Sequence, residues 1–239
     1  MNAAIILFSG GLDSTACLYW ALEKYEKIIL LSFLYGSKED ATIVKVHKKF
    51  SSIYKLESVI IKLPFLKKFT KSSGSSLSKS GKKIPSIIKF EQLDSKDFSN
   101  KTAKAVWVPG RNMLFISIAA AFGDSLDVPV KILFGANEEE GQTFPDNTTQ
   151  FVENINNTIK MGCRNDIEVI APFHKNQKEE IVEFLDKRNA KIKFSSSCYQ
   201  VRKWTKEGYP IHCGICESCQ RRKRAFKKAN KIDPTEYHK

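Results

Sequence analysis

The sequence predicts an α/β fold in which a parallel sheet is covered by helices on both faces. Two observations support this prediction: short apolar runs alternate with stretches of helical periodicity, and a glycine-rich turn follows the first apolar run. Strands separated by helices form parallel sheets, because a parallel connection needs a crossover. The chain has 239 residues, 42% of them hydrophobic, which suits one large domain or one domain with a small appendage.

The predicted elements alternate regularly along most of the chain. The strands are apolar runs at 3–8, 27–33, 56–63, 130–136 and 167–172. The helices follow at 14–25, 38–50, 112–126, 147–162 and 175–188. Within the second helix, Ile43, Val46 and Phe50 are three and four positions apart, as residues on one helix face are. Gly162 marks the end of the fourth helix, and the fifth is charged and amphipathic.

Residues 66–105 interrupt this alternation. They are rich in Ser, Lys and Gly and poor in large apolar side chains. A segment of this kind buries too little to offset its ordering entropy, so we expect a long, partly mobile loop. Long loops in compact domains are often active-site lids.

The net charge of +13 is concentrated in two stretches, 66–105 with +7 and 220–239 with +6. The rest of the chain is balanced, which argues against a generally basic nucleic-acid coat. The two patches could attract phosphates or RNA, but we favour their interpretation as a solvated loop and a solvated tail. No apolar run approaches the ~20 residues of a membrane span. The first run also lacks the basic leader of a signal peptide, so we expect a cytoplasmic protein.

The sequence SGGLDS, Ser9 to Ser14, stands where the first strand meets the first helix. The first N–H groups of a helix lack intrahelical partners, and the helix dipole favours an anion beside them. Gly10 and Gly11 allow a sharp turn and a close approach to a ligand. We therefore predict a phosphate cradle at the carboxyl end of this strand. Its candidate residues are Phe8, Ser9, Gly10, Gly11, Leu12, Asp13, Ser14 and Thr15.

The pattern S-G-G-x-D-S is neither of the two commonest phosphate loops, because it lacks the lysine of one and the glycine spacing of the other. It resembles the loop of enzymes that split ATP between its α- and β-phosphates and pass AMP to an acceptor oxygen. The alternative is an ordinary turn with a helix cap. For Asp13, we favour a role in holding Mg²⁺ over a role in complementing the helix dipole.

Four of the six cysteines gather near the C-terminal end, at Cys198, Cys213, Cys216 and Cys219. The spacing C-x14-C-x2-C-x2-C suits a tetrahedral zinc ion, and four thiolates leave no open coordination position. We therefore predict structural Zn²⁺, with a redox dithiol as the alternative. His212 is a competing ligand, but four thiolates are already present.

Three signals in order, SGGLDS, then VPGRN at 108–112, then the cysteine cluster with its CGICESCQRRKRAF run, resemble the QueC family of 7-cyano-7-deazaguanine synthases. The resemblance implies a Rossmann-like fold of the adenine nucleotide alpha hydrolase type with a pyrophosphatase loop. It divides the chain into a nucleotide-binding domain over 1–190, with 66–105 as an insertion or lid, and a zinc-binding segment over 191–239.

The resemblance also implies an ATP-dependent ligase acting on 7-carboxy-7-deazaguanine and ammonia. The carboxylate is adenylated, ammonia displaces AMP to give an amide, and a second adenylation leads to the nitrile used in queuosine or archaeosine synthesis. Asp13, Ser14 and Arg111 would be catalytic, and Arg111 and Asn112 would approach the phosphates. A homodimer is expected, with nucleic acid not required.

For the acceptor, the resemblance points to Tyr35, Asn137 and Asp146 as substrate-binding residues. The chain departs from the family pattern in three places. Glu140 and Asn147 stand where Asp and Cys are expected, the run after the second strand keeps Tyr35 but loses Gln and His, and 66–105 is inserted. An adenylating ligase with a different acceptor, or a transfer-RNA thiolation enzyme, is therefore the alternative.

Overall fold

The computed structural model describes residues 2–87 and 90–238 and confirms the predicted α/β fold. Its main sheet consists of β1 (Ala3–Leu7), β2 (Lys27–Leu34), β3 (Glu57–Lys62), β4 (Val130–Leu133) and β5 (Ile167–Ile170). All neighbouring strands are parallel, in the order β3-β2-β1-β4-β5. The strand that carries the glycine loop is therefore the central one, and the order changes direction on either side of it.

The sheet separates two apolar cores, because side chains alternate along each strand. Ile5 pairs with Ile29 on one side and with Ile132 on the other, and all three belong to one core. Ala4 and Ile6 point into the other core. Strands buried on both faces explain why β1 and β2 are continuous apolar runs rather than alternating ones.

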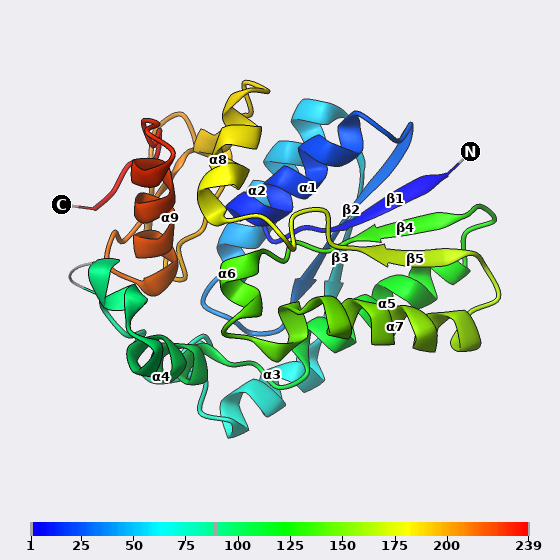
Figure 1. The fold of residues 1–239 in the computed structure, drawn as a ribbon, viewed down its shortest axis with the longest axis horizontal. Coiled ribbons are helices and arrows are strands. Elements are labelled where there is room, and N and C mark those ends of the chain that lie inside the picture. The colour runs from blue at the N-terminus through cyan, green and yellow to red at the C-terminus, as the bar shows by residue number, and fades with distance from the viewer. Residues whose placement is uncertain (1, 88–89, 239) are drawn as a thin grey trace.

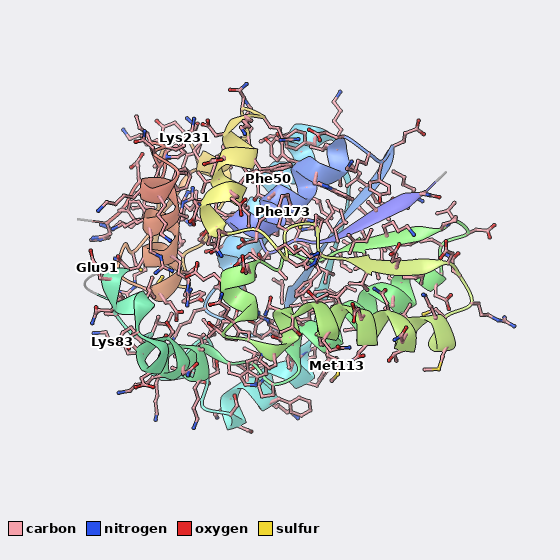
Figure 2. All side chains as sticks on the ribbon, viewed as in Figure 1. Phe50, Lys83, Glu91, Met113, Phe173 and Lys231 are labelled. Carbon is pink, nitrogen blue, oxygen red and sulfur yellow. The ribbon has the colours of Figure 1, made fainter. Side chains whose placement is uncertain are left out.

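The helices form a layer on each face of the sheet (Figure 1). One layer contains α1 (Leu12–Leu22), α2 (Asp40–Tyr54) and α8 (Lys178–Asp186), and the other α5 (Arg111–Asp124) and α7 (Thr149–Gly162). Phe50 and Phe173 lie within the first layer (Figure 2) and are nearly inaccessible to solvent. Every predicted helix is present. Most of their ends are shifted by a few residues, but the fourth predicted helix, α7, ends at Gly162 as expected.

The expectation that residues 66–105 form a loop without regular secondary structure is wrong, because this segment contains helices. It carries most of α3 (Pro64–Ser72), the 3-10 turn η1 (Phe90–Asp94) and nearly all of α4 (Lys96–Val106). A backbone bond ties the segment together across a long sequence separation: the Ser76 N–H donates to the Ala105 carbonyl at 2.8 Å. Leu77 is buried and its carbonyl accepts from the Lys38 N–H at 2.8 Å. A few apolar anchors therefore order a segment whose composition alone argues for disorder.

Beyond β4 the connections are short. They include α6 (Glu138–Gly141), η2 (Pro145–Asn147), η3 (Ile192–Phe194), the hairpin of β6 (Lys203–Trp204) and β7 (Pro210–Ile211), and α9 (Glu217–Lys228). The helix α9 packs on α8, and its Ala225 and Phe226 enter one of the two main cores. The division of the chain at residue 190 stays a prediction.

Within the described ranges, no single helix is long and apolar enough to cross a membrane. The pair α4 and α5, bent by 50° at their junction, passes the same test of length and composition when taken together.

Candidate active site and metal centre

The glycine loop connects β1 to α1 at the carboxyl edge of the sheet. Gly11 is the residue before the helix, and the first backbone bond of the helix runs from the Thr15 N–H to the Gly11 carbonyl at 3.0 Å. The N–H groups of the three residues before Thr15 consequently have no partner within the helix. The Gly10 N–H donates to Ser14 Oγ at 3.1 Å, so the serine helps to hold the loop.

Other segments of the chain pack tightly against the glycine loop on both sides. Gly10 has φ of +82°, and a Cβ there would come within 2.5 Å of Val46 Cγ1. Across the loop, a Cβ on Gly135 after β4 would come within 3.1 Å of the Ser14 nitrogen. From the C-terminal part of the chain, the Ser196 N–H donates to the Gly10 carbonyl at 2.7 Å. Three separate segments thus fix the loop.

Asp13, in the first turn of α1, belongs to a buried charge cluster. Lys178 Nζ lies 3.0 Å from Asp13 Oδ2 and 3.0 Å from Glu140 Oε1. Asn137 Nδ2 donates to Asp13 Oδ1 at 3.1 Å, and its Oδ1 accepts from the Glu140 N–H at 3.0 Å. Two carboxylates therefore share one ammonium group, so the cluster has an excess negative charge.

Burial and pairing act against each other in this cluster. Burial alone would lower the pKa of Lys178, but the carboxylates of Asp13 and Glu140 outweigh it and raise that pKa above its ordinary value. Burial raises the pKa of Asp13, and Lys178 offsets part of the rise. The ammonium group consequently stays charged at neutral pH, beneath the glycine loop.

The opposite wall is built around Arg111, the first residue of α5. Its Nε donates to Asn112 Oδ1 at 3.1 Å. Burial alone would lower the pKa of Arg111, but Tyr35, Asp146 and Glu39 outweigh it and raise it. Burial also raises the pKa of Tyr35 to about 12, so its phenol stays protonated near neutral pH. A guanidinium group facing a phenol and two acids suits the binding of an anion or a polar heterocycle.

Between these walls lies a cavity of about 230 Å³. The rings of Trp107 and Phe144 both line it, with an interplanar angle of 11° and centroids 6.2 Å apart. Phe115 also lines the cavity and stacks on Phe33, with centroids 4.2 Å apart. The cavity thus combines a polar floor at the glycine loop with aromatic walls, as sites for planar ligands do.

The second candidate site is the cysteine cluster, where the sulfur atoms of Cys198, Cys213, Cys216 and Cys219 lie within 4.8 Å of one another. A tetrahedral zinc with Zn–S bonds of ~2.3 Å places its sulfurs ~3.8 Å apart. The Cys213 and Cys219 sulfurs are separated by 3.9 Å. The four residues therefore fit a closed metal site. His212 is not part of this cluster, and its ring packs edge-on against Tyr237.

The basic tail differs from the solvated tail that the charge pattern suggested. Arg222 is fully buried, and its guanidinium pairs with Asp233 at 3.2 Å and donates to Ser195 Oγ at 3.0 Å. Arg221 pairs with Glu217 at 2.7 Å, and Arg221 and Arg224 both contact Glu139 on α6. The interpretation of the tail as solvated is therefore wrong for these arginines. Arg221 and Arg224 join α9 to α6, which carries the cavity residue Glu140.

The sequence profile of the family described as "Queuosine biosynthesis protein QueC" matches residues 3–230. The chain belongs to the QueC family. This confirms the resemblance drawn from the glycine loop, the VPGRN run and the cysteine cluster.

Curated relatives agree with this membership over almost the whole chain. A 7-cyano-7-deazaguanine synthase of Pyrococcus horikoshii is 43% identical over 99% of this chain and 98% of its own length. The synthase of Pyrococcus furiosus is 42% identical over 98% of this chain and 96% of its own. That of Methanocaldococcus jannaschii is 41% identical, with 98% of each chain covered.

In this QueC-family chain, most of the residues predicted from the sequence meet at the one cavity. Those that line it are Phe8, Ser9, Gly11, Asp13, Ser14, Tyr35, Arg111, Asn112 and Asp146. Gly10, Leu12, Thr15 and Asn137 do not line it. Leu12 and Thr15 are buried behind the loop, and Asn137 is buried against Asp13.

Several residues that line the cavity were not predicted from the sequence. They are chiefly Glu39, Trp107, Phe144, Lys178, Tyr199 and Ser218. The signal for Tyr199 and Ser218 was their place beside Cys198 and between Cys216 and Cys219, which puts the metal centre next to the cavity. Lys178 gave no signal, because one lysine among several at the start of a charged helix is usually solvated.

Proposed function

We propose that this chain converts 7-carboxy-7-deazaguanine and ammonia to 7-cyano-7-deazaguanine with ATP, as an ATP-dependent ligase of queuosine or archaeosine synthesis. The substrate carboxylate attacks the α-phosphate and pyrophosphate leaves. Ammonia displaces AMP to form the amide, and adenylation of the amide oxygen then allows AMP to leave and the nitrile to form. Two observations support this proposal: the chain belongs to the QueC family, and the glycine loop and Arg111 line the same cavity.

The observation that carries the proposal is the juxtaposition of the glycine loop with Arg111 across one cavity. Ser9, Gly11, Ser14 and the free N–H groups at the start of α1 would grip the leaving diphosphate. Lys178 supplies a fixed positive charge beneath them. Arg111 and Asn112 would hold the α-phosphate or the acyl-adenylate from the other side.

The acidic cluster fits a hard cation. Asp13 would hold Mg²⁺, directly or through water, with Glu140 adding negative charge nearby. When bound, the ion would neutralise charge on the diphosphate. Asn137 contributes by orienting the Asp13 carboxylate, to which it donates at 3.1 Å.

For the acceptor, Asp146 and Tyr35 are the proposed polar contacts. A deazaguanine offers ring and exocyclic N–H groups, which need an acceptor such as the Asp146 carboxylate. Tyr35, with its protonated phenol, can donate to a carbonyl or carboxylate oxygen. The Trp107 and Phe144 rings provide apolar surface for the planar ring system.

The metal of the four-cysteine centre is proposed to be Zn²⁺, because four thiolates at tetrahedral spacing suit this ion and leave no open position for catalysis. Its role is structural: it joins Cys198 to the 213–219 loop and so fixes two stretches of the cavity wall.

We also propose that the enzyme works as a homodimer. Phe65 and Phe69 of α3 pack edge to face and remain 41% and 52% exposed in the single chain. A second copy could cover this apolar pair. Light scattering of the purified protein measures its oligomeric state, and a monomer at micromolar concentration would refute the proposed homodimer.

The decisive experiment is mass spectrometry of the product formed from 7-carboxy-7-deazaguanine, ATP and ammonia, together with pyrophosphate release. We expect the nitrile and AMP, with release only when the deazaguanine acid or its amide is present. Pyrophosphate release that depends on transfer RNA instead would overturn the proposal.

A further inference from the structure

The reaction described above, on which this inference rests, leaves protons to be removed. Ammonia attack on the acyl-adenylate forms the C–N bond and breaks the C–O bond to AMP, and the nitrogen must lose one proton. Adenylation of the amide oxygen releases a second N–H proton. In the final step the remaining N–H proton leaves as C≡N forms and the C–O bond to AMP breaks. Each step therefore needs a base near the substrate nitrogen.

Four acids from the described part of the chain line the cavity, and three of them are already engaged. Asp13 and Glu140 pair with Lys178 at 3.0 Å each. Asp146 accepts from Asn147 Nδ2 at 3.1 Å. The carboxylate of the fourth, Glu39, accepts no hydrogen bond from any described residue, and this part of the lining contains no histidine.

Glu39 is held at a fixed place by its neighbours on the chain. Asp40 accepts from the N–H groups of Gly36 and Ser37, at 2.8 and 3.1 Å, and from Ser37 Oγ at 2.7 Å. Lys38 is turned away and donates to the carbonyls of Ser76 and Lys82. The turn between β2 and α2 is thus locked, and the one side chain that it leaves facing the cavity without a bond is Glu39.

We propose that Glu39 is the general base of this enzyme, taking the proton from the substrate nitrogen in amide formation and again in nitrile formation. The acid is on the same wall as Arg111 and Tyr35, where the acyl group is expected, and not at the diphosphate end. It returns each proton to water between steps. The first adenylation needs no base, because its nucleophile is already a carboxylate.

The electrostatic surroundings suit this task. Burial raises the pKa of Glu39 to about 7; Arg111 opposes the rise and Asp40 adds to it. Among the described residues, Tyr35 and Tyr199 also interact electrostatically with Glu39, and burial raises the pKa of both phenols. A base works best when its pKa lies near the operating pH, since it is then both available and able to accept a proton.

The test is Glu39→Gln, assayed separately for adenylation and for the later steps. Carboxylate-dependent exchange of pyrophosphate into ATP should stay within about threefold of the unaltered enzyme. Conversion of the purified amide plus ATP to the nitrile should fall by about 10²–10⁴-fold, the usual contribution of a general base. Glu57→Gln is the matched control, because Glu57 is exposed at the opposite edge of the sheet.

The amide reaction also gives a pH profile that ammonium ionisation does not disturb. The rate of the unaltered enzyme should fall as the pH drops through about 7, the pKa of Glu39, and Glu39→Gln should lack this step. Glu39→Asp should recover part of the rate. The role of Glu39 would be overturned if Glu39→Gln formed the nitrile at the unaltered rate, or if it lost pyrophosphate exchange as well as nitrile formation. Absence of carboxylate-dependent exchange in the unaltered enzyme would instead overturn the proposed function.

Discussion

Lys178 is the side chain on which the charge balance of the site depends. It is 5% exposed and contacts two buried carboxylates, so its removal would leave both without the ammonium group with which they pair. The same ammonium group lies under the end of α1 that is proposed to hold the diphosphate. Stability and phosphate binding are therefore linked at one residue.

Lys178→Met should lower the free energy of unfolding by about 3–5 kcal/mol, the usual cost of breaking a buried ion pair from one side. Adding Asp13→Asn should recover part of this loss, because it removes one of the stranded charges. Urea unfolding of both variants measures the effect. Lys131→Met is the control, since Lys131 pairs with Glu168 at the surface and is expected to contribute less than about 1 kcal/mol. Equal losses in the two lysine variants would contradict the prediction.

His47 gives the molecule a pH-dependent stability. Ser32 Oγ donates to the Phe8 carbonyl, so His47 Nδ1, which lies 2.6 Å from Ser32 Oγ, carries a hydrogen and donates it to this hydroxyl oxygen. Burial lowers the pKa of His47 from 6.5 to about 4. The unfolded chain therefore binds a proton more readily than the folded one between these values, and stability is lost as the pH falls from about 6.5 to 4.

His47→Gln should flatten the dependence of unfolding free energy on pH across this window, by roughly 2–3 kcal/mol in total, as a shift of this size implies. Urea titrations at a series of pH values check this. His238→Gln, which removes an exposed imidazole, is the control. The same slope in His47→Gln and the unaltered chain would show that another group is responsible.

At the scale of elements, the strands of the sheet and the helices that cover it could be predicted from the local sequence pattern, whereas α4 could not. The apolar runs at β1 and β2 are buried on both faces, so their sequence directly reflects their environment. In α4, exposed lysines alternate with the buried Ala103 and Val106, and the order comes from contacts with distant segments. Composition cannot reveal such contacts, because they depend on where the rest of the chain lies.

The same limit applies to the site. The glycine loop, Arg111 and the cysteines lie in dense local motifs, and the chemistry of those motifs requires particular residue types. Lys178 and Glu39 lie in ordinary charged stretches, and their importance comes only from the cavity that the fold builds around them. Residues that act through tertiary position alone were therefore missed.

The metal centre is the element that should respond most to a single change. Cys216→Ser should abolish stoichiometric metal binding, measured by elemental mass spectrometry, and lower the melting temperature by on the order of 10 °C. Cys163→Ser is the matched control, because Cys163 is half-buried and outside the cluster. Retained metal in Cys216→Ser would refute the four-thiolate site.

At the scale of the whole molecule, the segment before α4 connects the two sites. Lys38 binds its Leu77 carbonyl, and further along the Ile87 N–H donates to the Ile215 carbonyl at 2.7 Å. Ile84 is buried against the cysteine cluster. The segment therefore runs from the turn after β2 to the metal loop, beside α9 (Figure 1).

Removal of the metal with a chelator should consequently destabilise this segment locally. Hydrogen exchange measured by mass spectrometry should accelerate at Ile84 to Ile87 and around Tyr199, because their partners lose their anchor. Peptides from α7, which packs on the far face of the sheet, should exchange as before. Uniform acceleration over both regions would indicate global destabilisation rather than this connection.

The central place of β1 determines where the chain can change in length. A single residue inserted between Ala3 and Leu7 would exchange the side chains that face the two cores and swing the glycine loop off its axis. The turn at 125–129 enters β4 from the opposite edge of the sheet and contributes no residue to the cavity lining. Length variants should therefore survive at that turn and fail in β1.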